Sequence, residues 1–174
     1  MNKELDDFLR KVEFLLYDEK DPKAAIEVLD EILLIYSNSF YTLYYLMVAY
    51  YQLDKFQEAL DYAENLVSLN EETESVTIEK QYNYLNLMKA KVLQENPNLD
   101  IGKSYQSPIV IIADNTSEGI KKEYQFIQLV HSQYKRVKQS LQNTESGVYD
   151  VITIEINGIQ QDYYFEISSF FGNW

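Results

Sequence analysis

The sequence contains no cysteine, so a disulfide, a thiolate zinc site and a cysteine nucleophile are all excluded. Histidine occurs once and glycine five times in 174 residues. So few of either leave little for a histidine-rich metal site or a glycine-rich phosphate loop. The scarcity of catalytic side chains favours a protein that is not an enzyme.

Long apolar runs are also absent. No stretch approaches the roughly 18 residues of a membrane-spanning helix, so the sequence predicts no membrane span. The first residues, MNKELDDFLRKV, lack the basic start, apolar centre and small-residue cleavage site of a signal peptide. As the chain stands, a cytoplasmic location is expected. A periplasmic or surface location is the alternative if a signal segment has been removed.

Positive charge is scarce as well, and the formal net charge is −13. Residues 1–100 hold 20 acidic and 9 basic residues, a balance of −11, whereas residues 101–174 hold 8 and 6, a balance of −2. Because nucleic acid is a polyanion, the N-terminal half should repel it. The charge therefore favours a basic protein or peptide partner, or simply an acidic surface that aids solubility.

The clearest pattern that is present lies in residues 40–70. Two segments with apolar residues at spacings of three and four flank a polar turn at residues 53–55, which predicts a helical hairpin. A similar pattern lies upstream at a step of 34 residues, which relates Ala25 to Ala59, Leu9 to Leu43 and Val12 to Leu46. Hairpins repeating every 34 residues resemble the tetratricopeptide repeat, and that resemblance implies a stack of helical hairpins.

The remaining helices of the N-terminal half are expected at 2–17, 22–36 and 76–94. The last has no partner helix of its own and is placed to cap the repeats. Asn96 precedes Pro97 and therefore avoids helical angles, which ends this helix. The sequence thus predicts a tetratricopeptide-like helical domain over 1–97 and a second domain over 98–174.

The second domain has the pattern of a small sheet. Strands are expected at 108–113, 148–156 and 159–167, and Asn157-Gly158 is a strong signal for a tight turn between the last two. Residues 134–142 fit either a helix or a strand, and we favour a strand. A helix over 117–131 should face the sheet with the stripe Ile120, Tyr124, Ile127 and Val130. The expected fold class is α+β: a helical hairpin array followed by a small antiparallel sheet with one covering helix.

The order of several short motifs suggests a family for this second half. Asp100-Ile101-Gly102-Lys103-Ser104, Tyr149-Asp150-Val151-Ile152 and Tyr164-Phe165-Glu166-Ile167 follow one another along the chain. Residues 99–172 resemble a bacterial DUF4919-like domain of unknown function, whose members end with a similar pair of motifs. The resemblance implies a fold and no activity. Secretion signals are frequent among members of that family.

Tyrosine is unusually abundant, with 16 residues, ten of them before residue 100. In the geometry of the repeat, one face of the first and third helices lines an inner groove, and tyrosine suits such recognition surfaces because it joins a large ring to a polar tip. The candidate binding residues are Arg10, Phe14, Tyr17, Tyr41, Tyr44, Val48 and Tyr51. An equally weighted alternative is that these rings fill the groove from within as core.

Other candidate chemistry is weaker. His131 alone is expected to be a surface or capping residue, and Gly102-Lys103-Ser104 lacks the earlier glycine and the strand–loop–helix context of a phosphate loop. We expect no cofactor, no metal site and no catalytic residue. The sequence favours a non-enzymatic protein- or peptide-binding or scaffolding module. The alternative is a small hydrolase or ligand-binding activity in the C-terminal sheet domain.

Overall fold

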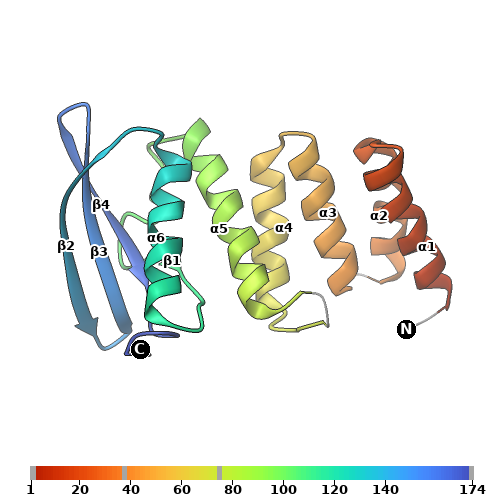
Figure 1. Cartoon of the computed structure of the whole chain (residues 1–174). Coiled ribbons are helices and arrows are strands. Elements are labelled where there is room, and N and C mark those ends of the chain that lie inside the picture. The colour runs from red at the N-terminus through yellow and green to blue at the C-terminus, as the bar shows by residue number, and fades with distance from the viewer. Residues whose placement is uncertain (1–2, 37–38, 74–75, 173–174) are drawn as a thin grey trace. The chain divides into compact units, whose positions relative to one another are not determined.

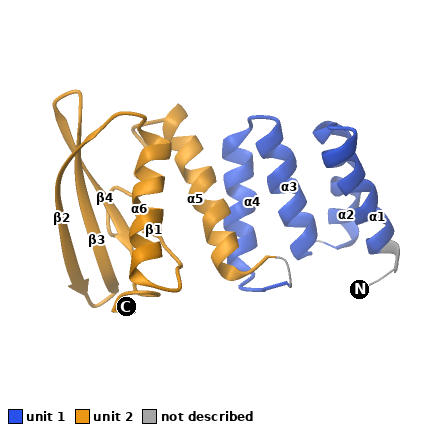
Figure 2. Cartoon of the chain, in the orientation of Figure 1, with its two compact units in different colours: residues 1–73 blue, residues 74–174 orange. Residues whose placement is uncertain are grey.

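The computed structural model of the chain describes residues 3–36, 39–73 and 76–172. It is an α+β structure, as predicted, and its two compact units cover residues 1–73 and 74–174 (Figure 2). The sequence places the division after residue 97, whereas the structure places it after residue 73. The reason is helix α5 (Ile78–Glu95), which belongs to the second unit, where the side chain of Asn86 donates a hydrogen bond to the Val110 carbonyl at 2.9 Å.

The described part of the first unit is helical (Figure 1). Helix α1 (Lys3–Glu13) runs directly into a single π-helical turn, η1 (Phe14–Asp18), and is followed by α2 (Pro22–Ile35), α3 (Phe40–Gln52) and α4 (Phe56–Ser68). Asp21 caps α2 by accepting a hydrogen bond from the Ala24 amide at 3.1 Å, and Pro22 occupies the first helical position. The predicted helical hairpin at 40–70 and its turn at 53–55 are confirmed.

The 34-residue step relates positions that are buried alike. Ala25 and Ala59 are both fully buried, as are Val12 and Leu46, while Leu9 and Leu43 are both 6% exposed. Apolar side chains from α1, η1, α2 and α3 form one core cluster in this unit. Equal burial at equal spacing means that the two hairpins use the same positions to face their neighbours.

The second unit contains α5, β1 (Ile109–Val110), α6 (Thr116–Val130), β2 (Lys135–Thr144), β3 (Gly147–Ile156) and β4 (Ile159–Glu166). The strands lie in the order β1-β4-β3-β2. Strands β2, β3 and β4 form an antiparallel meander, but β1 runs parallel to β4, so the sheet is mixed rather than purely antiparallel. The strand favoured over 134–142 is confirmed. Asn157 and Gly158, at φ 52° and 82°, form the predicted tight turn.

One face of this sheet is covered by α6, as predicted, and additionally by the end of α5. The buried cluster joins Ala90 and Leu93 of α5, Phe126 and Ile127 of α6, and inward side chains of the sheet, namely Ile109, Ile152, Ile154, Tyr163 and Phe165. The opposite face is partly covered by the loop before β1. There the Tyr105 ring meets those of Tyr149 and Tyr164 edge-on, with centroids 5.1 and 4.7 Å apart.

The buried face of α6 differs by about one residue from the predicted stripe. Gly119, Glu123, Phe126 and Ile127 are buried, whereas Ile120 is 38% exposed. The ring of Phe170 lies where a side chain at position 119 would project, so only glycine fits there. This close approach turns Gly119 inward and carries Glu123, one helical turn later, into the interior.

Strand β2 forms one edge of the described sheet, because it is the last strand in the order β1-β4-β3-β2. Its pairing register with β3 shifts between Arg136 and Lys138, and the side chains of Lys135, Arg136, Val137 and Lys138 are exposed. The edge of the sheet is therefore irregular and basic at the start of this strand.

Ala59→Leu should destabilise the first unit. Ala59 is fully buried on α4, and added methylenes in a packed core typically cost about 1–3 kcal/mol. Urea denaturation followed by circular dichroism measures the change. Ala24→Leu on half-buried α2 surface is the matched control and should cost less. Equal effects of the two substitutions would contradict the close packing inferred at Ala59.

Gly119→Ala should destabilise the second unit, although alanine is the better helix former by roughly 1 kcal/mol. The new methyl group would overlap the Phe170 ring, and relieving that overlap should outweigh the gain in propensity. Lys121→Ala, at an exposed position of the same helix, is the control and should leave the melting temperature nearly unchanged. A more stable Gly119→Ala protein would show that Phe170 does not pack against this helix.

Candidate functional site

The predicted binding residues of the N-terminal segment lie at the end of α1 and in η1. Arg10, Phe14 and Tyr17 are spaced by four and three residues, and all three are exposed. The π-helical turn is closed by a hydrogen bond from the Glu19 amide to the Phe14 carbonyl at 3.0 Å. Phe14 and Tyr17 are each 51% exposed, so this turn presents two large rings to solvent. Single π-helical turns occur frequently at functional sites.

The predicted residues of α3 are less exposed. Tyr41, Tyr44, Val48 and Tyr51 are all half-buried. Tyr41, Tyr44 and Val48 pack against the core cluster of the first unit, and the Tyr51 ring meets that of Phe56 at 5.7 Å. The sequence left open whether these rings form a recognition surface or fill the core. The rings of η1 are exposed at the surface, whereas those of α3 are half-buried and pack partly in the core.

Two clefts lie along these elements. One, of about 280 Å³, brings Arg10 of α1 and Tyr41 of α3 together, and its lining is completed by Asp6, Leu9, Glu13 and Tyr45. The other, of about 580 Å³, includes Tyr17 with Leu16, Lys20, Pro22, Gln52 and Leu53. Phe14, Tyr44, Val48 and Tyr51 line neither of the two. The structure thus places three of the seven predicted residues in clefts.

Tyr45 also lines the first cleft, and it is not among the binding residues predicted from the sequence. It is 7% exposed, and its hydroxyl donates a hydrogen bond to the Glu13 carboxylate. Burial raises the pKa of Tyr45, and the adjacent carboxylate raises it further, so the hydroxyl stays protonated. This bond ties α1 to α3 at the wall of the first cleft. The signal available in the sequence was the spacing of Tyr45 and Ala49 on the core side of α3, since a buried tyrosine needs a partner for its hydroxyl.

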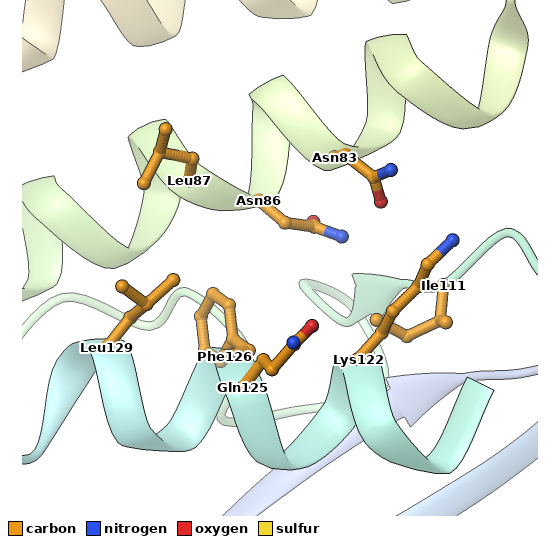
Figure 3. A pocket seen from close by; sticks show the side chains of 8 residues that line it. All are labelled: Asn83, Asn86, Leu87, Ile111, Lys122, Gln125, Phe126 and Leu129. Atoms are coloured by element: carbon orange, nitrogen blue, oxygen red, sulfur yellow. The ribbon is translucent and has the colours of Figure 1, made fainter. Parts of the chain in front are cut away.

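A third cleft, in the second unit, lies between α5 and α6 and measures about 160 Å³ (Figure 3). Two of its polar side chains, Asn86 and Lys122, make structural contacts. Asn86 binds the Val110 carbonyl, and the Lys122 ammonium donates to the Ile112 carbonyl at 2.7 Å and pairs with Glu79 at 2.6 Å and Glu118 at 3.3 Å. The hydrogen bond from Lys122 lowers the pKa of Glu79. The ion pair of Lys122 with Glu79 therefore links α6 to α5 at this cleft.

His131 lies at the C-terminal cap of α6, in keeping with a capping role. Its Nε2 atom is 2.7 Å from the hydroxyl of buried Tyr163, and burial together with the Lys103 ammonium lowers its pKa. The nearby Gly102-Lys103-Ser104 segment forms no phosphate cradle. The Gly102 amide donates to the Ser107 carbonyl at 2.6 Å, the Gly102 carbonyl accepts from the Tyr164 amide at 2.8 Å, and a strand follows.

Comparisons with protein-family models, curated proteins and solved structures find no match to this chain. The resemblances to tetratricopeptide repeats and to the DUF4919-like family therefore stay predictions. Within residues 3–36, 39–73 and 76–172, no group of three or more histidine or acidic side chains is arranged to hold a metal ion. In the same residues, no helix is both long and apolar enough to cross a membrane.

Tyr45→Phe should weaken the first unit by about 1 kcal/mol, because it removes a hydrogen bond to a carboxylate whose own side chain is exposed. Chemical denaturation of the full chain measures this change. Tyr41→Phe, on a half-buried ring of the same cleft, serves as the control. If Tyr45→Phe is no less stable than the control variant, the bond to Glu13 contributes nothing to holding α1 against α3.

Proposed function

We propose that the protein is a non-enzymatic peptide- or protein-binding module whose recognition surface is the face formed by α1, η1 and α3. The observation that carries the proposal is the exposure of Phe14 and Tyr17 on one π-helical turn beside two clefts. Aromatic side chains supply large contact area at low entropic cost, and they dominate binding hot spots. Tyr41 and the other half-buried residues of α3 would form the wall against which a partner packs.

The repeat pattern supports this reading. Tetratricopeptide-like arrays consist of helical hairpins that repeat every 34 residues. Ala25 and Ala59 are one such step apart and are equally buried. Such arrays stack hairpins into an extended surface suited to binding other chains. We therefore place the function on the first unit. In the second unit's cleft, Asn86 and Lys122 bind structural partners, so the alternative hydrolase or ligand-binding role has less support.

The partner should be basic. Residues 1–73 contain 16 acidic and 6 basic residues, and the first cleft carries Asp6 and Glu13 against the single cation Arg10. Opposite charge accelerates association and selects among partners, and salt screens it. The expected ligand is a short segment that combines lysine or arginine with an apolar or aromatic anchor.

The test uses the full chain and an array of short synthetic peptides, one half rich in lysine and arginine and the other rich in aspartate and glutamate. Basic peptides should bind, and binding should weaken as sodium chloride is raised. Phe14→Ala combined with Tyr17→Ala should reduce affinity strongly, because a hot-spot ring contributes about 2 kcal/mol, or roughly thirtyfold, to binding. The fold should be retained, since both rings are half exposed.

Leu34→Ala is the matched control, because Leu34 is an apolar residue of α2 that is 88% exposed. It should leave peptide affinity unchanged. Equal losses in the control and the double variant would show that exposed apolar surface, and not this face, holds the peptides. Binding of acidic peptides in preference to basic ones would contradict the charge argument.

A further inference from the structure

Two carboxyl groups of the second unit are buried in the interior between α6 and the sheet, where each shifts the pKa of the other. Glu123 of α6 is fully buried and Asp150 of β3 is 6% exposed. Asp150 pairs with Phe165 of β4, whose side chain belongs to the core under α6, so Asp150 points toward the same helix. Neither oxygen of Glu123 has a hydrogen-bond partner, and neither does Oδ1 of Asp150.

The neighbouring polar groups are already committed. Gln139 of β2 donates from Nε2 to Oδ2 of Asp150, and its Oε1 accepts from the Tyr124 hydroxyl at 3.0 Å and from the Arg136 guanidinium. These donors fix the orientation of the amide, because its oxygen must face them and its nitrogen must face the carboxylate. Gln139 therefore satisfies one oxygen of the pair and leaves three without a donor.

An ionised carboxylate accepts hydrogen bonds but cannot donate one, so two ionised groups would leave these oxygens buried, unpaired and mutually repulsive. One added proton resolves this conflict, because a protonated carboxyl group donates to its neighbour. We propose that Glu123 and Asp150 share a single proton, donated by Glu123 to Asp150, and that this proton fastens α6 to the sheet and is released at alkaline pH.

The surrounding charges indicate which group holds the proton. Burial raises the pKa of Glu123, and the Asp150 carboxylate raises it further, to about 8. Burial also raises the pKa of Asp150, but the hydrogen bond from Gln139, the one that a protonated Glu123 donates and the charge of Arg136 oppose that shift. The other titratable groups around this network are Tyr124 of α6 and Tyr134 in the connection to β2. Asp150 therefore ionises first, and Glu123 keeps the proton near neutral pH.

The consequence for stability has a definite sign. Below the ordinary glutamate pKa of about 4.5, Glu123 is protonated in both the folded and the unfolded chain and adds no pH dependence. Between that value and about 8, the unfolded chain loses the proton while the folded chain retains it. Stability therefore falls as pH rises, by up to a tenfold increase in the unfolding equilibrium constant per pH unit, and levels off above this range.

The experiment compares the full chain with Glu123→Gln in urea denaturation from acidic to alkaline pH. Glutamine keeps the shape of the side chain and can donate permanently to Asp150. The variant should lose most of the pH dependence and should be more stable than the parent protein at pH values near 8. Glu145→Gln makes the same substitution at an exposed turn and should retain the parental pH dependence.

Infrared spectroscopy supplies a direct readout. The carbonyl band of a protonated carboxylic acid should be present at neutral pH, disappear on alkalinisation and be absent from Glu123→Gln. If that variant fails to fold, Asp150→Asn tests the same pair, because asparagine can donate to Glu123. A parent protein without the band at neutral pH would overturn the proposal. Stabilisation by added calcium or magnesium that disappears in Glu123→Gln would also overturn it, since the pair would then bind a cation.

Discussion

The close approach of α6 to the sheet determines the arrangement of the second unit. Phe126 packs edge-on against the rings of Tyr163 and Phe165, and Gly119 leaves room for Phe170 at the other end of the helix. With no cysteine to add a covalent link, this burial supplies the cohesion of the layer. The same approach brings Glu123 into the interior. Close apolar packing thus places a carboxyl group where its ionised form lacks hydrogen-bond donors.

Much of the fold could be predicted from periodicity, because the positions that alternate or recur along the chain are also those that become buried. The hairpin over 40–70, the strands and the Asn157-Gly158 turn follow from local patterns. The inward face of α6 does not, since Ile120 is the more apolar residue and only the distant ring of Phe170 makes Gly119 the buried one. The place of α5 likewise depends on contacts made far along the chain, such as that of Asn86 with Val110.

The candidate site was predictable to a similar degree. Spacing predicts one helical face for Arg10, Phe14 and Tyr17, because a helical face is a local property, and all three side chains are exposed. It does not distinguish exposed rings from packed ones on α3, where burial depends on neighbouring helices. Tyr45 was not among the predicted binding residues for the same reason, because its hydroxyl bonds to Glu13, which is 32 residues earlier. Within the first unit, tyrosines therefore occur both packed between helices, as Tyr45 is, and exposed at the π-helical turn, as Tyr17 is.

The irregular edge at β2 affects how this molecule meets others of its kind. An unpaired strand offers amide and carbonyl groups to any extended chain, and a straight apolar edge would invite sheets to join. Here a register shift interrupts the ladder between Arg136 and Lys138, and a copy of the strand approaching in parallel register would bring like charges together. These cations are clustered on one strand of a chain whose net charge is −13. The edge should thus resist fibrillar growth even when the protein is concentrated.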